Sequence, residues 1–283
     1  MRLTEALRGL LPCHPGAVIA LVGAGGKTSA LFGLAAELAE GSPGGVLLTT
    51  TTQIVDPRTE AGREFDQLVL DPVLARAPGE APESWPRQAQ PGPGRRVVLA
   101  SGTDPVQGKL LGVHPGRFAG LGLGWSWVLV EADGSRKRPV KAPAEHEPVL
   151  PVPVDLVLGV IGLTCLGQPM DAGSVHRPEL FGPLTGCARG APIGCAHLAA
   201  LVASPHGLFQ GVPAGVPRVL LLNQADRYPG IPEGLLGDLC DSGPVAADRV
   251  LVCALGDARP GARVLARMQG ATGRVVTGDA PCA

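Results

Sequence analysis

The chain has 283 residues, of which 45% are hydrophobic and 3% aromatic, and its formal net charge is −1, from 24 basic and 25 acidic side chains. This length allows a sizeable core in one large domain or two small ones. The balanced charge and the scarcity of aromatic residues argue against nucleic acid or a membrane surface as a partner, and no run of about 18 apolar residues predicts a membrane span.

Seven cysteines are scattered along the chain without a C-x-x-C pair, which does not support a zinc ribbon or a thioredoxin-like motif. The first residues carry an acidic side chain and no apolar run of signal-peptide length. An odd number of cysteines without such a signal predicts reduced thiols and a cytoplasmic protein. A selenium-carrying thiol at Cys165, Cys187 or Cys195 is a further hypothesis, against the more common fate of a buried apolar side chain.

A short helix is predicted over residues 3–11, and a phosphate-binding loop follows it. Residues 18–22 are five apolar residues in a row, typical of a buried strand, and residues 28–40 show the 3.6-residue period of a helix. Glycines between them would let the backbone approach an anion, with a lysine for charge and a threonine hydroxyl for Mg²⁺. The nucleotide-binding residues predicted on this basis are Gly23, Ala24, Gly25, Gly26, Lys27, Thr28 and Ser29.

The spacing of this loop leaves alternatives open. The standard phosphate-loop pattern has a glycine where Leu21 stands, so the loop has the compact form Gly-x-x-Gly-Lys-Thr, which resembles that of Mur-type ATP-dependent ligases. A dinucleotide fingerprint fits Gly23 and Gly25 but has Thr28 at its third glycine. A plain glycine-rich turn between strand and helix is the third interpretation.

Residues 46–48 predict a second strand, which runs into four threonines, residues 49–52. The carboxyl edge of a parallel sheet is where ligands bind, so Thr50, Thr51 and Thr52 are candidate substrate-binding residues. The equally weighted alternative is a β-branched strand end with solvated hydroxyls. Residues 76–96 are rich in proline and glycine and predict a loop excursion. A strand is expected at 97–100, and residues 101–109 predict a connecting turn.

Residues 127–130 predict a strand that ends in Glu131, followed by Asp133 and Ser135. Two carboxylates spaced i, i+2 point to the same side of an extended chain. We therefore predict that Glu131 and Asp133 bind Mg²⁺ or polarise the attacking group, with Ser135 beside the substrate. A turn with an Asp-Gly signal is the alternative.

Residues 137–148 are charged and stiffened by proline, so neither a helix nor a central strand is expected. A loop that presents Lys141 and His146 to a ligand is one interpretation. A solvated charged loop is the other, and composition favours it.

Further strands are predicted at 155–161, 219–222 and 249–253, with a short one near 275–276 and a small helix at about 193–202. His176 and Arg177 are candidate anion contacts, although each is more often a surface or structural residue. Asn223 and Asp226 resemble the guanine-reading Asn-Lys-x-Asp of GTPases, with Gln224 in place of the lysine, and are predicted to bind the base.

Three segments together resemble the YqeC family: residues 22–28, residues 49–52, and the run 131–135 with 141–148. The resemblance extends over about residues 15–255. It implies a cytosolic accessory protein of selenium-dependent molybdenum hydroxylases, acting in maturation of the selenium or molybdenum cofactor. The implied partners are a molybdenum cofactor or selenium species and an apo molybdenum hydroxylase. Gln224 departs from the pattern of a guanine-reading loop. This departure weakens the prediction of a guanine preference more than it weakens the prediction of nucleotide binding.

The predicted fold is a single α/β domain of the P-loop type, with a mostly parallel sheet and helices on both faces. The leading function is a Mg²⁺-dependent ATP- or GTP-binding maturation enzyme that hydrolyses the nucleotide or transfers a phosphoryl group. Its predicted catalytic residues are Lys27, Glu131, Asp133 and His146, with Thr28, Glu131 and Asp133 as metal ligands. The alternatives are a nucleotide-gated cofactor carrier and a Mur-like ligase.

Overall fold

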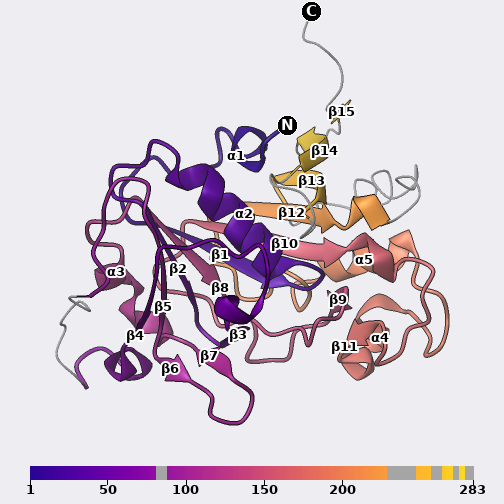
Figure 1. Cartoon of the computed structure of the whole chain (residues 1–283). Coiled ribbons are helices and arrows are strands. Elements are labelled where there is room, and N and C mark those ends of the chain that lie inside the picture. The colour runs from indigo at the N-terminus through magenta and orange to yellow at the C-terminus, as the bar shows by residue number, and fades with distance from the viewer. Residues whose placement is uncertain (81–87, 228–246, 256–262, 270–273, 278–283) are drawn as a thin grey trace, which may run out of the picture.

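The computed structural model of the protein describes residues 1–80, 88–227, 247–255, 263–269 and 274–277. A ten-stranded sheet in the order β15-β14-β13-β12-β10-β1-β8-β2-β5-β4 forms its centre (Figure 1). The eight strands from β13 to β4 are parallel, and β14 and β15 add to the β13 edge as antiparallel strands. In chain order these strands are β1 (Ala17–Gly23), β2 (Val46–Thr50), β4 (Gln67–Leu70), β5 (Arg96–Ala100), β8 (Trp127–Glu131), β10 (Leu156–Gly162), β12 (Arg218–Asn223), β13 (Arg249–Ala254), β14 (Arg263–Gln269) and β15 (Arg274–Thr277).

Two small sheets and a set of mostly short helices surround the central sheet. The small sheets are β3 (Gln53–Val55) with β7 (Lys109–Leu111) and β6 (Gly102–Thr103), and β9 (Val140–Lys141) with β11 (Val175–His176). The α-helices are α1 (Leu3–Ala6), α2 (Lys27–Ala39), α3 (Phe118–Leu121), α4 (Pro178–Thr185) and α5 (Cys195–Ala203). The 3₁₀ turns are η1 (Pro57–Thr59), η2 (Pro72–Ala75), η3 (Pro115–Arg117), η4 (Leu163–Cys165) and η5 (Ala225–Arg227).

Both faces of β1 are buried, which explains why its sequence is continuously apolar. Ile19 and Leu21 pack in the hydrophobic cluster that contains α1 and α2, whereas Ala20 and Val22 pack in the cluster that contains α4 and α5. A strand between two layers of helices has no solvated face and therefore shows no alternation of apolar and polar residues. The predicted α/β fold, with a mostly parallel sheet and helices on both faces, is confirmed.

Several elements differ from the sequence-based expectation. The leading helix ends at Ala6, and Gly9 lies beyond it at φ 82°, a left-handed conformation that cannot continue a right-handed helix. The strands β4 and β14, the small sheet of β3, β6 and β7, and helix α4 were not predicted. Their segments are short or contain proline and charged residues, so neither period is evident over their length. Residues 76–80 and 88–95 form no helix or strand, and the rest of the predicted excursion lies outside the described residues.

The order of the strands determines where a ligand can bind. β1 lies between β8 and β10, and the chain leaves β1 through α2 and returns at β2, on the far side of β8. Parallel strands bring their carboxyl ends to one edge of the sheet. Gly23, Glu131, Gly162 and Asn223, which end β1, β8, β10 and β12, are therefore gathered at one edge.

Candidate functional site

The turn from β1 into α2 is a tight loop that requires glycine. Gly25 has φ 84° and Gly26 has φ 121°, conformations that L side chains rarely adopt. A Cβ atom on Gly25 would lie 2.2 Å from the backbone nitrogen of Gly162 and 2.6 Å from the carbonyl oxygen of Pro139. These glycines thus allow the turn to pack against the end of β10.

The backbone N–H groups of this turn are available to an anion. Within the described part of the chain, the N–H groups of Gly25, Gly26, Lys27 and Thr28 have no hydrogen-bond acceptor, whereas those of Gly23 and Ala24 are bonded to Asp133 and Val160. Because α2 begins at Lys27, these free donors form the positive end of a 13-residue helix. Such an arrangement binds phosphate groups in many proteins.

Lys27 is buried over the turn and held by oxygen atoms. Its Nζ donates to the carbonyl oxygen of Gly23 at 2.6 Å and lies 3.2 Å from Oδ1 of Asp133 and 3.8 Å from Oε1 of Glu131. The side chain is 2% exposed, so its charge is compensated mainly by these two carboxylates. The structure thus brings together Lys27, Glu131 and Asp133, three of the four predicted catalytic residues.

Thr28 and Glu131 form the part of the site that suits a divalent cation. The Thr28 hydroxyl donates to Oε2 of Glu131 at 2.9 Å, and both residues line the same cavity. Burial raises the pKa of Glu131, although the nearby Lys27 acts in the opposite direction. Mg²⁺ commonly uses one or two protein oxygens together with phosphate oxygens and water, and this pair fits such a set. The described residues contain no group of three or more His, Cys, Asp and Glu side chains arranged for a metal.

Asp133 lies behind this pair, in a buried chain of alternating charges. One of its oxygens accepts the N–H of Gly23 at 2.9 Å and lies 3.0 Å from Nζ of Lys141. Lys141 also donates to Glu147 at 2.7 Å and to the carbonyl oxygen of Gly134 at 2.8 Å. With both oxygens close to lysines and only 2% of its surface exposed, Asp133 is not among the residues lining the cavity.

The chain of charges ends at Glu147 and Arg177. The Arg177 guanidinium donates to both carboxylate oxygens of Glu147, to Oε1 at 3.1 Å. Burial alone would raise the pKa of Glu147, but the hydrogen bonds from Arg177 and Lys141 outweigh it and lower that pKa to about 2. The interpretation of residues 137–148 as a solvated loop is therefore wrong for Lys141 and Glu147, which are buried and paired with charged side chains.

A cavity of about 670 Å³ lies at the turn, and we call it the P-loop cavity after the phosphate-binding loop that the sequence predicts there. It is lined by Gly25, Gly26, Thr28, Ser29 and Ser135 among other residues. Seven cationic side chains line it (Lys27, Arg63, Lys109, Arg136, Lys137, Arg138 and Arg227), against the three acidic ones Glu60, Glu131 and Asp226. This excess of positive charge favours a polyanionic ligand.

Asn223 holds the turn in place. Its Nδ2 donates to the carbonyl oxygen of Gly25 at 2.9 Å, and its Oδ1 accepts the N–H of Leu255 at 2.9 Å. Asn223 is buried and links β12, the turn and the end of β13, whereas Asp226 is exposed at the cavity wall. Both residues predicted to bind a base line the cavity, and the side-chain amide of Asn223 is already engaged by Gly25 and Leu255.

The candidate threonines at the end of β2, Thr50 to Thr52, do not line the P-loop cavity. The Thr50 hydroxyl donates to the carbonyl oxygen of Glu131 at 2.7 Å, and that of Thr51 to the carbonyl oxygen of Val149 at 2.6 Å. Thr52 lies beside Thr50, with 3.5 Å between the two hydroxyl oxygens. The Thr50 bond joins the ends of β2 and β8, and all three hydroxyls have partners within the protein.

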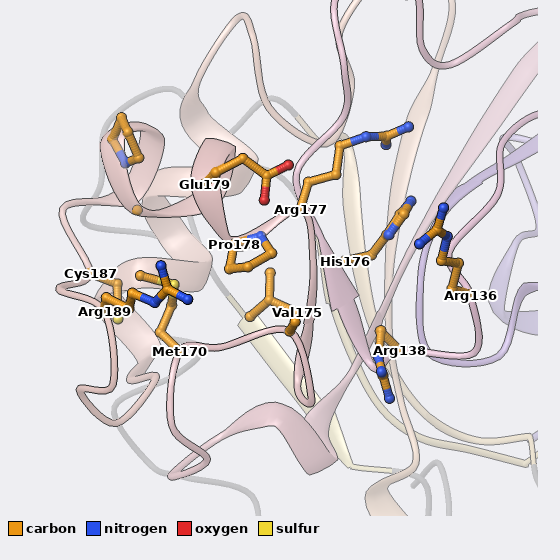
Figure 2. A pocket seen from close by; sticks show the side chains of 13 residues that line it. Arg136, Arg138, Met170, Val175, His176, Arg177, Pro178, Glu179, Cys187 and Arg189 are labelled. Carbon is orange, nitrogen blue, oxygen red and sulfur yellow. The ribbon is translucent and has the colours of Figure 1, made fainter.

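His146 is exposed and lines neither the P-loop cavity nor the second cavity, which contains His176 and Arg177. His176 and Arg177 lie away from the P-loop cavity, in the wall of this second cavity of about 780 Å³, which we call the arginine cavity (Figure 2). Burial and the neighbouring Arg177 lower the pKa of His176 to about 4, so this imidazole is neutral at pH 7.

Sequence reasoning missed part of the wall of the P-loop cavity. Arg63 donates to Glu60 at 3.3 Å and to the Ser29 hydroxyl at 3.3 Å, and its guanidinium lies 5.6 Å from the centre of the Phe32 ring. Gln53 and Lys109 come from the small sheet of β3 and β7. No motif marks these residues, because their position depends on how segments distant in sequence pack together.

The cysteines named as selenium carriers include two buried thiols. Burial raises the pKa of Cys165 to about 12 and also raises that of Cys187. Both thiols are therefore protonated at neutral pH, and the thiolate is the form that would carry such chemistry. Cys195 is partly exposed and packs beside the core.

Comparison with known proteins identifies the family. Within the described residues, no helix is long and apolar enough to cross a membrane, and no solved structure matches the chain significantly. The family model described as "YqeC protein" matches residues 19–179. The chain is also 36% identical over 219 residues, 73% of its length and 75% of the relative's, to an Escherichia coli (strain K12) protein described as "Uncharacterized protein YqeC". The chain therefore belongs to the YqeC family.

Proposed function

We propose that this protein binds a Mg²⁺-nucleotide, ATP or GTP, in the P-loop cavity and uses it in maturation of the selenium or molybdenum cofactor of a molybdenum hydroxylase. The nucleotide part of the proposal is supported by the geometry of the site. The pathway and the hydroxylase partner are supported by the family resemblance alone.

The observation that carries the proposal is the turn between β1 and α2. Four backbone N–H groups without an acceptor in the described chain belong to residues that line a cavity with an excess of cations. At the same place the Thr28 hydroxyl lies 2.9 Å from a carboxylate oxygen of Glu131. A triphosphate with its Mg²⁺ would satisfy the N–H groups, the cations and the two oxygen ligands together.

In this arrangement the N–H groups and Lys27 would bind the phosphates, while Thr28 and Glu131 would hold Mg²⁺. Hydrolysis or phosphoryl transfer would then depend mainly on positioning and charge stabilisation. Asp226 at the cavity wall would accept hydrogen bonds from the base.

A nucleotide-gated carrier is the second candidate. The placement of His146 and Asp133, the candidates for a general base in catalysis, favours it. His146 is exposed away from the P-loop cavity, and both oxygens of Asp133 are close to lysine ammonium groups. Neither residue is free to accept a proton beside a bound γ-phosphate. Slow turnover with nucleotide-dependent binding of a cofactor or apo-hydroxylase would follow.

Calorimetric titration with Mg-ATP and Mg-GTP tests the proposal. We expect micromolar binding of one or both nucleotides, weakened at least tenfold in Thr28→Ala and in Lys27→Ala, because each variant removes a group placed for the phosphates or Mg²⁺. Asp226→Asn should weaken GTP binding and leave ATP binding unchanged if guanine is the preferred base.

Thermal unfolding of each variant establishes that it is folded, which matters for the buried Lys27. Arg76→Gln is a matched control, because Arg76 is exposed and lines neither cavity. Absence of binding by both nucleotides to folded wild-type protein would refute the proposal. Release of phosphate at more than about one turnover per second would favour the enzyme over the carrier.

A further inference from the structure

The arginine cavity lies beside the P-loop cavity and shares two residues with it. Arg136 and Arg138, from the loop that joins β8 to β9, line both. Figure 2 shows these two side chains and His176 at one end of the arginine cavity, with Arg189, Met170 and Cys187 at the other. The two cavities are therefore neighbours, with the arginine pair at the end where they meet.

The lining of the arginine cavity has an excess of positive charge without internal compensation. It contains four arginines, and its one acidic residue is Glu179. Of these arginines, only Arg177 forms an ion pair within the described residues, and its partner Glu147 is outside the lining. His176 contributes no charge at pH 7, as its pKa of about 4 shows. Arginine binds phosphate and carboxylate groups through paired N–H donors, so this lining is suited to an anion.

Two of the arginines are held in backbone conformations that L residues seldom adopt. Arg136 has φ 48° and Arg177 has φ 66°. Such a conformation is unfavourable for an L residue and persists only where the surrounding structure holds it. The Arg177 side chain is further held by Glu147, at the end of the buried chain of charges. The backbone and the side chain of Arg177 are thus both held in place by the protein.

The middle of the cavity is apolar. Val175 and Pro178 lie between the two basic ends in Figure 2, and Met170 adds to the same lining. Apolar and polarizable side chains pack well against a ring or another flat body. A cavity of about 780 Å³ is large enough for a molecule of metabolite size.

We propose that the arginine cavity binds a small organic phosphate, a molecule with an apolar or ring-shaped body and a phosphate monoester group. Its place as the second substrate or cargo, next to the nucleotide at Arg136 and Arg138, rests on the proposed function. The binding itself does not depend on it. A nucleic acid fits less well, because the chain has a net charge of −1 and the described lining of this cavity contains no aromatic residue on which bases could stack.

Phenyl phosphate is a suitable probe, because it combines a ring with a phosphate monoester dianion. We expect calorimetry to show saturable binding of phenyl phosphate, weaker binding of inorganic phosphate and none of phenol. The double variant Arg138→Gln/Arg189→Gln should raise the Kd for phenyl phosphate at least tenfold, because it removes a charged donor from each end of the cavity. The matched double variant Arg8→Gln/Arg76→Gln removes the same charge from exposed positions outside both cavities and should leave the Kd unchanged.

The outcomes separate this proposal from nucleotide binding. If phenyl phosphate binds in the arginine cavity, a saturating Mg-nucleotide should not displace it, and the binding should persist even if no nucleotide binds the protein. No binding of phenyl phosphate, full displacement by nucleotide, or equal weakening in the two double variants would overturn the proposal. Preferential binding of a single-stranded oligonucleotide, lost in Arg138→Gln/Arg189→Gln, would also overturn it, in favour of a polyanion surface.

Discussion

The residues of greatest consequence in this protein are charged and buried. Lys27, Asp133, Lys141 and Glu147 are each at most 8% exposed and stand in a row in which each charge has an opposite neighbour. Removal of one partner from a buried pair leaves an uncompensated charge and commonly costs about 3–5 kcal/mol. The row connects the turn at the P-loop cavity with Arg177 at the arginine cavity.

Glu147 should make stability depend on pH in the acid range. Its ordinary pKa of 4.5 is lowered to about 2 in the folded protein. At about 1.4 kcal/mol for each pH unit of this difference, Glu147 contributes about 3 kcal/mol at pH 7. Because the folded pKa is the lower one, this contribution is present above about pH 4.5 and is lost as the pH falls toward 2. Denaturant unfolding of Glu147→Gln should therefore show a loss of about 3 kcal/mol at pH 7 and roughly half of that at pH 3.

Glu145→Gln provides the control for this prediction, because Glu145 lies in the same loop, is exposed and forms no ion pair within the described residues. It should unfold like the wild type at both pH values. A Glu147→Gln protein whose deficit does not change between pH 7 and pH 3 would show that the carboxylate is not held ionised in this way.

At the scale of elements, the turn between β1 and α2 depends on how closely it approaches β10. A Cβ on Gly25 would overlap backbone atoms, which cannot move as a side chain can. Gly25, Gly26, Lys27 and Thr28 of the same turn line the P-loop cavity. The structure of this turn and the proposed binding of phosphate therefore depend on the same residues.

Gly25→Ala should lower the free energy of unfolding by about 2–5 kcal/mol, of which about 1–2 kcal/mol comes from the positive φ and about 1–3 kcal/mol from the overlap. Gly41→Ala is the matched control, since Gly41 has φ 72° and open space where its Cβ would lie. This variant should lower the free energy of unfolding by about 1–2 kcal/mol, which is the cost of the positive φ alone. Equal losses in urea unfolding of the two variants would mean that the close approach to Gly162 is not maintained in solution.

At the scale of the whole molecule, the parallel sheet combines groups from distant parts of the chain into one site. Glu131 follows Thr28 by 103 residues, and Asn223 follows Gly25 by 198, yet both pairs are joined by hydrogen bonds of 2.9 Å. A ligand at this edge contacts the ends of several strands at once. Its binding energy should therefore stabilise the folded chain as a whole.

A Mg-nucleotide present at 100 times its Kd should stabilise the protein by about 2.7 kcal/mol. For a chain of this size we expect the Tm to rise by about 5 °C or more. Thermal unfolding followed by circular dichroism would measure the shift. Mg²⁺ with adenosine or guanosine, which lack phosphates, should leave the Tm unchanged, and an equal shift with these nucleosides would show that the turn does not bind the phosphates.

The sequence by itself determined the local features of the fold. Five apolar residues before a glycine-rich turn and a periodic helix after it specified β1, the turn and α2, because each of these signals is local and strong. The buried strands β8, β10, β12 and β13 were predicted for the same reason. Glu131 and Asp133 were also placed correctly at the carboxyl end of a strand.

Only the tertiary structure decided which of those residues share a site and which have structural roles. In the folded chain the hydroxyls of Thr50 and Thr51 donate to backbone carbonyl oxygens, and Lys141 is buried between two carboxylates. His146 is exposed and lines neither cavity. The tertiary structure also brought Arg136, Arg138, Arg177 and Arg189 around one cavity, although nothing in their spacing marks them as a set. The physical reason is that side-chain partners and cavity walls depend on contacts between segments that are distant in sequence, and a local pattern carries no information about such contacts.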